Sequence, residues 1–359
     1  MKLPLFVAAS RAIGLLAGCS TPEPEGKGGN TTTTTTTSGD KGATPTKSDL
    51  LIGLVFDQGG LGDKSFNDSA NAGLQAAKAK YGVKVQTVDS KAESDYKTNL
   101  EALAEQGAAL VIGVGISMHD SVDAAAKKYP KTKFAIVDAS VTAHNVRSLL
   151  FREEEGSFLA GYLAGEVTKT NKLGFVGGME IPLILKFQYG YEAGALAANP
   201  KVEFLPAKFT GVWTDIDLGK TTANVLYGQG ADIIYAAAGR CGIGVISAAK
   251  DNKKYAIGVD SDQDDLAQGS VLTSMIKHVD TAVQDTIGSV VDGSYAPGEK
   301  IYDLKAGGVG LSEMKFTKDV IGADKIKALD AVKADIISGK IKVPATKADF
   351  DTFAAAAKK

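Results

Sequence analysis

The amino-acid sequence predicts an α/β protein of two lobes, each built on a doubly wound parallel sheet. Short apolar runs alternate with amphipathic stretches of helical length, which is the pattern of consecutive βαβ units. The alternation runs from residue 51 to 138 and starts again after residue 151. The chain has 359 residues, of which 44% are hydrophobic and 23% charged, so it is long enough to form two buried cores.

The first lobe is predicted over residues 50–150. Residues 51–56 form a short, almost wholly apolar run, as expected for a strand covered on both faces of a parallel sheet. The segments that follow alternate between the helical and the extended apolar period. We therefore expect strands at 51–56, 83–88, 109–114 and 134–138, with helices at 70–79, 96–105 and 121–129 between them.

The second lobe is predicted over residues 151–275. It opens with a helix at 157–166 that is rich in Gly and Ala and therefore suited to close packing. The remaining segment, residues 276–359, is expected to cross back between the lobes and complete both of them. Strands of the second lobe are expected at 172–178, 202–208, 232–236, 255–259 and 271–275.

Residues 1–19 have the order of parts of a bacterial lipoprotein signal peptide. A positive start at Lys2 leads into an apolar stretch that ends in Leu-Ala-Gly-Cys, which resembles a lipobox with Cys19 as the lipid acceptor. The stretch is shorter than the roughly 20 residues that span a bilayer. Arg11 departs from the uninterrupted apolar segment of such signals. We expect lipid on Cys19 to hold the protein at the cell membrane in an extracytoplasmic location; a buried N-terminal helix with an incidental cysteine is the alternative.

Residues 20–49 differ sharply in composition from the rest of the chain. They are rich in Thr, Gly, Pro, Glu and Lys and include an unbroken run of threonines at 31–37. Such a segment has too little apolar surface to offset the entropy of ordering it. It is predicted to be a disordered linker between the lipid anchor and the folded lobes.

Several classes of function are not supported by the sequence. A formal net charge of -2 without a run of Lys and Arg gives no basis for nucleic-acid binding. The three histidines, His119, His144 and His278, have no metal-binding spacing, and residues 113–118 lack the last glycine of a dinucleotide fingerprint. No nucleophile and base are arranged as in a hydrolase, and Cys241 is expected to be a packed thiol. We therefore expect no enzyme activity, no cofactor and no metal.

Ligands of doubly wound sheets bind beyond the carboxyl ends of the strands. Five segments of this chain resemble those of a known protein family. In order and content they resemble the basic membrane protein family of ABC transporter substrate-binding lipoproteins, which includes PnrA-like purine nucleoside receptors. The resemblance implies a periplasmic-binding-protein-like fold with a nucleoside in the cleft between the lobes, for delivery to an ABC permease in the membrane. The segments are Asp63-Lys64-Ser65-Phe66-Asn67, Glu153-Glu154-Glu155-Gly156-Ser157-Phe158-Leu159-Ala160-Gly161, Gly230-Ala231-Asp232-Ile233-Ile234, Gly258-Val259-Asp260-Ser261-Asp262-Gln263 and Thr273-Ser274-Met275-Ile276-Lys277.

The resemblance also implies two aromatic side chains that stack on the base. Phe66 matches one of them, and Trp213 lies where the second is expected, although relatives usually carry Phe there. Stacking of a base on an aromatic ring contributes about 1–3 kcal/mol. Phe187 is a further aromatic candidate for the cleft, and Ser65 is a candidate N-cap for the helix that follows it.

Charged residues complete the implied site. Asp138 is similar to the family acid that recognises the base edge, Asp260 to the acid that bridges the ribose hydroxyls, and Lys277 to the lysine on the sugar side. The first loop adds Asp57 and Asn67 as polar candidates. Gly239 has no side chain and would leave room for a ligand. After it the chain departs from the family, because Arg240-Cys241-Gly242 replaces a smaller, glycine-rich turn. Arg240 is expected either at the mouth of the cleft or facing solvent.

Two alternatives to a nucleoside receptor remain open. One is a binding protein for a sugar or another small polar solute on the same scaffold. The other is a surface-interaction lipoprotein whose cleft has no ligand. Titration with a panel of nucleosides distinguishes a nucleoside receptor from the first alternative, which predicts no binding of a purine nucleoside. Replacement of Phe66 or Asp260 by Ala tests the second alternative, which predicts no effect of either change.

Overall fold

The computed structural model describes residues 49–357. The expected signal peptide and lipobox, 1–19, and the linker up to residue 48 lie outside the described residues. Within the described part, the first sheet has six strands in the order β12-β5-β4-β3-β1-β2, and every neighbouring pair is parallel. Its strands are β1 (Leu51–Val55), β2 (Lys84–Val88), β3 (Leu110–Val114), β4 (Lys133–Val137), β5 (Val146–Phe151) and β12 (Gly298–Tyr302).

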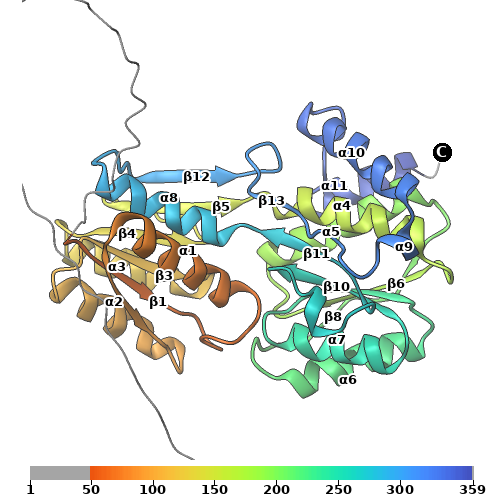
Figure 1. Cartoon of the computed structure of the whole chain (residues 1–359), viewed down its shortest axis with the longest axis horizontal. Coiled ribbons are helices and arrows are strands. Elements are labelled where there is room, and N and C mark those ends of the chain that lie inside the picture. Colours follow the sequence, from red (N-terminus) through yellow and green to blue (C-terminus); the bar gives the residue numbers. More distant parts are fainter. Residues whose placement is uncertain (1–48, 358–359) are drawn as a thin grey trace, which may run out of the picture. The chain divides into compact units, whose positions relative to one another are not determined.

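The second sheet is ordered β13-β11-β10-β9-β6-β7, with β8 also pairing with β6. Figure 1 shows β6, β10 and β11 of this sheet in the lobe that also contains α6 and α7. Its strands are parallel apart from β13, which runs antiparallel to β11 at the edge. The strands are β6 (Lys172–Gly177), β7 (Glu203–Phe204), β8 (Lys208–Phe209), β9 (Ile233–Ala237), β10 (Tyr255–Asp260), β11 (Val271–Lys277) and β13 (Val309–Leu311).

Helices cover both faces of each sheet. Ile52 and Leu54 of β1 pack in one buried cluster with Leu74, whereas Val55 packs in another cluster with Leu100 and Val122. This alternation is the expected consequence of side chains pointing to opposite faces of a strand. The predicted fold class is therefore confirmed. The helices are α1 (Phe66–Tyr81), α2 (Tyr96–Glu105), α3 (His119–Lys128), α4 (Glu153–Val167), α5 (Pro182–Ala198), α6 (Ile216–Gly228), α7 (Cys241–Asp251), α8 (Val279–Val291), α9 (Lys318–Ile321), α10 (Ala323–Ile337) and α11 (Lys347–Ala357).

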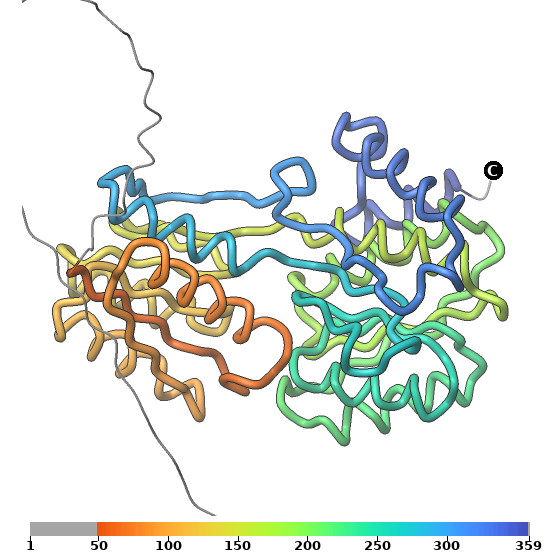
Figure 2. The backbone as a smooth tube through the Cα atoms, viewed as in Figure 1, coloured from red at the N-terminus to blue at the C-terminus, as the bar shows by residue number. Residues whose placement is uncertain are grey.

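The chain passes between the two sheets three times, after β5, after β11 and after β12. The second passage brings α8 back onto α1 and adds β12 to the edge of the first sheet beside β5. Figure 2 shows this blue segment running alongside the yellow and orange part of the chain. Each lobe is thus assembled from separate stretches of sequence, and three connections link them.

Several strands differ from the sequence-based expectation. None was predicted in residues 276–359, where the structure has β12 and β13. Strand β5 was not predicted, because Arg147 interrupts its apolar pattern; the structure buries this arginine by hydrogen bonds from Nε to the carbonyl of Ala296 and from Nη1 to Ser289 Oγ, both 2.8 Å. The strand expected at 202–208 is two short strands, β7 and β8. Pro206 lies between them and has no N–H to donate to a sheet.

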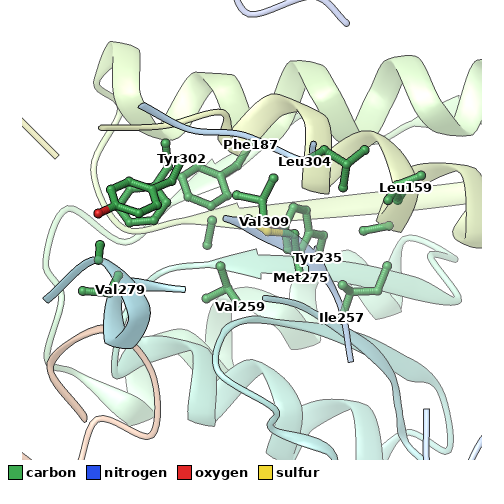
Figure 3. Close-up of a cluster of buried hydrophobic side chains, with 14 of the residues drawn as sticks. Leu159, Phe187, Tyr235, Ile257, Val259, Met275, Val279, Tyr302, Leu304 and Val309 are labelled. Carbon is green, nitrogen blue, oxygen red and sulfur yellow. The ribbon is translucent and has the colours of Figure 1, made fainter. Parts of the chain in front are cut away.

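The largest buried cluster draws residues from both lobes. Figure 3 shows Phe187 of α5, Val259 of β10 and Met275 of β11 within it. None of the helices in residues 49–357 combines the length and the apolar character that crossing a membrane requires.

Candidate functional site

A cavity between the lobes contains every side chain or glycine expected in the ligand site. The space open to the centre of a water-sized sphere measures about 80 Å³. A single water needs about 10–15 Å³ on this measure, so the cavity has room for a small molecule. The expected residues that line it are Asp57, Phe66, Asn67, Asp138, Phe187, Trp213, Gly239, Asp260 and Lys277.

Most of these residues lie at or directly after the carboxyl ends of strands. Asp138 follows β4, Gly239 follows β9, and Asp260 and Lys277 end β10 and β11. Asp138 and Asp260 have φ angles of 69° and 64°. Asp tolerates this left-handed conformation better than most residues, and the sharp change of chain direction leaves each carboxylate at the cavity wall.

Lys277 and Asp138 form a buried ion pair across the two lobes. The Nζ atom lies 2.6 Å from Asp138 Oδ1 and 3.1 Å from Oε1 of Glu153. Only 1% of Lys277 is exposed. The ammonium also lies 5.3 Å from the ring centroid of Phe66 and 5.6 Å from that of Phe187. Rings and carboxylates therefore surround a fully desolvated cation.

The pKa values of this cluster are shifted by burial and by charge. Burial lowers the pKa of Lys277, but the carboxylates of Asp138, Glu153 and Asp260 outweigh it and hold the pKa above its usual range. Burial raises the pKa of Asp138 and that of Asp260 to about 6, against the opposing effect of Lys277. Both acids are ionised at neutral pH and can accept hydrogen bonds from a ligand.

The first loop is held in shape by Asp63, a residue that sequence reasoning missed. Its carboxylate accepts hydrogen bonds from the backbone N–H groups of Ser65, Asn67 and Asp68 at 2.8–3.1 Å. Ser65 was expected to cap α1 with its side chain, and this expectation is wrong: its Oγ donates instead to Oδ2 of Asp260. Asp63 satisfies the helix start, so the serine hydroxyl is free to join the lobes.

Asp57 and Asn67 line the cavity, and part of their hydrogen-bonding capacity is already taken up by contacts within the protein. The carboxylate of Asp57 accepts hydrogen bonds from Tyr96 Oη and from the backbone N–H of Gln58. Burial raises the pKa of Asp57. Asn67 Oδ1 accepts from the backbone N–H of Asp57 at 3.1 Å, and its Nδ2 donates to Asp63. These contacts fix the loop against the end of β1.

Glycines make room for the indole of Trp213. A Cβ atom on Gly178 would lie 2.1 Å from the Trp213 ring, which is far inside any contact distance. A Cβ on Gly239 would lie 3.6 Å from the same ring, and the φ angle of Gly239 is 54°. Phe187 is buried in the core and also lines the cavity.

Glu153 and Arg240 are two further residues of this region. For Arg240 the sequence left two positions open, the mouth of the cleft or the solvent, and the structure has it at the cavity. Glu153 lies in one of the segments that resemble the family, but no local sequence pattern connects it with Lys277, whose Nζ it contacts. Arg240 lines the cavity, and its Nη1 donates to the carbonyl oxygen of Gly59 in the other lobe at 3.4 Å. The replacement of a glycine-rich turn by an arginine was the available signal.

Hydrogen bonds hold the lobes together around the cavity. Gln263 Nε2 donates to the carbonyl of Lys64 at 2.9 Å, and Ser261 Oγ donates to the carbonyl of Ser65 at 3.2 Å. These contacts connect the start of α1 to the end of β10. Among residues 49–357 there is no group of three or more side chains suited to holding a metal ion.

Comparisons with known proteins identify the family of the chain. Residues 51–347 match the Bmp family model, described as ABC transporter substrate-binding protein PnrA-like. The chain is 36% identical to the ABC transporter nucleoside-binding protein BmpA of Lactococcus lactis, over 94% of this chain and 96% of that protein. It is 34% identical to basic membrane protein A of Borreliella afzelii, over 84% of this chain and 94% of that protein.

A solved structure shares the architecture. The crystal structure of ABC transporter solute-binding proteins from Aeropyrum pernix superposes with a TM-score of 0.78 and 29% identity, over 86% of this chain and 98% of that one. The chain therefore belongs to the PnrA-like family of ABC transporter substrate-binding proteins, extracytoplasmic proteins that bind a small-molecule ligand for a membrane permease.

Proposed function

We propose that this protein captures a nucleoside, most favourably a purine nucleoside, and presents it for uptake. The observation that carries the proposal is the composition of the cavity. It is lined by Phe66 and Trp213 on the aromatic side and by Asp138, Asp260 and Lys277 on the charged side. A nucleoside has the matching parts, a flat base and a sugar with adjacent hydroxyl groups.

The aromatic residues would bind the base by stacking. Each stacked face contributes about 1–3 kcal/mol, and the indole offers a larger face than phenylalanine. The close fit of the Trp213 ring against Gly178 supports this role, because it restricts the ring before a ligand arrives. A restricted ring loses less side-chain entropy on binding.

The carboxylates would bind hydrogen-bond donors of the ligand. Asp260 is proposed to accept from the sugar hydroxyls and Asp138 from N–H groups of the base. Lys277 compensates both carboxylates and keeps them ionised at neutral pH. Buried acceptors without compensation would be costly.

The charge of the cavity favours nucleosides over nucleotides. Four carboxylates, those of Asp57, Asp63, Asp138 and Asp260, line it together with the two cations Lys277 and Arg240. A phosphate group would add negative charge to a wall that already has an excess of it. We therefore expect phosphorylated ligands to be rejected.

We also propose that the protein is attached to the membrane by lipid on Cys19. The support is the Leu-Ala-Gly-Cys sequence at the end of the apolar segment, followed by the threonine-rich linker. A tethered protein would then be present at a high local concentration near the permease that receives the ligand.

Isothermal titration of the purified protein with guanosine, inosine, adenosine, uridine, arabinose and glucose tests the proposed ligand. We expect saturable binding of at least one purine nucleoside, weaker binding of uridine and none of the sugars. Heat with a sugar and none with any nucleoside would favour the alternative solute. No heat with any of them would remove the nucleoside proposal.

A further inference from the structure

Arg240 is the second cation of the cavity, and the proposed binding mode gives it no role. It directly follows Gly239 beyond β9 and is the N-cap residue of α7. The strand order β11-β10-β9 separates Arg240 from Lys277 by two strand spacings, or about 10 Å. The two side chains therefore enter the cavity from different strand ends.

The guanidinium of Arg240 is almost unused by the protein. Its one hydrogen bond within the described residues is the contact from Nη1 to the carbonyl of Gly59, at 3.4 Å. No carboxylate in residues 49–357 forms an ion pair with it. A guanidinium has five N–H donors in a planar fork. Most of this donor capacity is therefore available to a ligand, in contrast to Lys277, which two carboxylates already hold.

The backbone connects Arg240 directly to the proposed stacking residue. The N–H of Cys241, the next residue, donates to the carbonyl oxygen of Trp213 at 3.3 Å. A Cβ on Gly239, the preceding residue, would lie 3.7 Å from Cβ of Trp213. A base stacked on the indole would thus lie near the backbone from which the Arg240 side chain extends, and both side chains line the cavity.

We propose that Arg240 donates two hydrogen bonds to the O6 and N7 atoms of a 6-oxopurine, which makes guanosine and inosine the preferred ligands. This inference rests on the proposed nucleoside function. An arginine fork matches these two acceptors, whereas adenine presents an amino donor at position 6 that faces the guanidinium unfavourably. The 6-oxopurines also carry an N–H at N1, which suits a cavity rich in carboxylates.

Titrations of the unmodified protein test the proposal without any change to its fold. We expect guanosine and inosine to bind at least about tenfold more tightly than adenosine. We expect 7-deazaguanosine, which lacks the N7 acceptor, to lose about tenfold relative to guanosine, while 7-deazaadenosine and adenosine differ less. Equal affinity for guanosine, adenosine and 7-deazaguanosine would overturn the role of Arg240 and leave the nucleoside function standing. Failure of every nucleoside to bind would overturn both.

The variant Arg240→Gln separates base recognition from a general effect on lobe closure. Glutamine pairs with the N6 and N7 atoms of adenine, so we expect guanosine affinity to fall by about tenfold or more while adenosine affinity stays or rises. Equal weakening of both ligands would show that Arg240 acts by closing the lobes through Gly59, and would overturn the proposal. Arg152→Gln is the matched control, because that guanidinium lies 3.5 Å from Glu154 and does not line the cavity; it should change neither affinity.

Discussion

The Nζ atom of Lys277 and the Oδ1 atom of Asp138 lie 2.6 Å apart, although the two residues belong to different sheets. Asp138 is only 9% exposed and Lys277 1%. The pair therefore joins the lobes at the wall of the cavity between them. An ammonium and a carboxylate that are both desolvated depend on each other, because neither can be solvated by water when its partner is removed.

Replacement of Lys277 by methionine should strongly destabilise the protein. Asp138, Glu153 and Asp260 would be left buried without a cation, and removing one partner of a buried pair typically costs about 3–5 kcal/mol. Chemical denaturation measures the loss. Lys220→Met is the control, because Lys220 pairs with Asp251 at the surface and should change the free energy of unfolding by about 1 kcal/mol or less. A loss for Lys277→Met no larger than that of the control would contradict the ion-pair account.

Ligand affinity should fall when the pH drops below about 6. The pKa of Asp138 and that of Asp260 are each raised to about 6 by burial, so protonation would remove the acceptors that we propose for the ligand. One such group predicts about a tenfold loss of affinity between pH 7 and pH 5. Titration calorimetry over this range measures it, and an affinity that is independent of pH from about 5 to 8 would contradict the proposed role of these carboxylates.

The same two groups affect folding stability with the opposite sign. Their folded pKa values lie above the unfolded value of about 3.9, so the folded state takes up protons more readily. Their stabilising contribution is complete below about pH 4 and is lost as the pH rises through about 6. Asp260→Asn should therefore flatten the fall of the free energy of unfolding between these pH values, which denaturation at several pH values can measure; an unchanged profile would contradict the raised pKa of Asp260.

Substitution of Gly178 by alanine should reduce nucleoside binding without unfolding the lobe. The new methyl group would lie 2.1 Å from the present position of the Trp213 ring and force the indole to move. Gly178 does not have a positive φ angle, so alanine brings no backbone strain there. We expect at least about a tenfold loss of affinity, the value of one stacked face. Gly228→Ala, where no atom lies within 4 Å of the added Cβ, should bind normally; equal affinity for both variants would contradict the stacking role of Trp213.

Cys19→Ala should release the protein from the membrane. Lipid on Cys19 is the proposed anchor, and the variant removes its acceptor thiol. Fractionation of bacterial cells that express the full chain compares the membrane-bound share of the two proteins. Cys241 provides the control, since Cys241→Ala changes a buried thiol in α7 and should leave membrane attachment intact. Membrane association of Cys19→Ala equal to that of the unchanged chain would contradict lipid anchoring through this residue.

Sequence patterns predict the parts of this molecule that depend on local periodicity. The apolar runs before Asp138, Asp260 and Lys277 mark strands and place these residues at strand ends, where ligands of such sheets bind. That the three meet at one cavity between two different sheets followed only from the resemblance to the family. The contact of Glu153 with Lys277 could not be predicted, because the two residues are remote in sequence. For the same reason, the return of β12 to the first sheet could not be predicted: no strand was predicted in residues 276–359, and the partner strand β5 is remote in sequence.

The capping of α1 by Asp63 instead of Ser65 is a second feature that the sequence alone could not predict. Both residues are good helix caps, so composition alone favoured the serine next to the helix. Tertiary context decided otherwise, since the serine hydroxyl bonds to Asp260 from the other lobe while Asp63 accepts the free N–H groups. Capping propensity predicts where the helix starts, but it does not predict which side chain accepts hydrogen bonds from the free N–H groups there.

Fluorescence of the single tryptophan tests the central claim most directly. Trp213 is the only tryptophan in the sequence, so the emission reports on one wall of the cavity. We predict that guanosine changes the emission saturably, with a midpoint equal to the dissociation constant from calorimetry, and that Gly178→Ala moves this midpoint at least about tenfold to higher concentration. An unchanged emission at nucleoside concentrations that saturate the calorimetric signal would contradict a base stacked on Trp213.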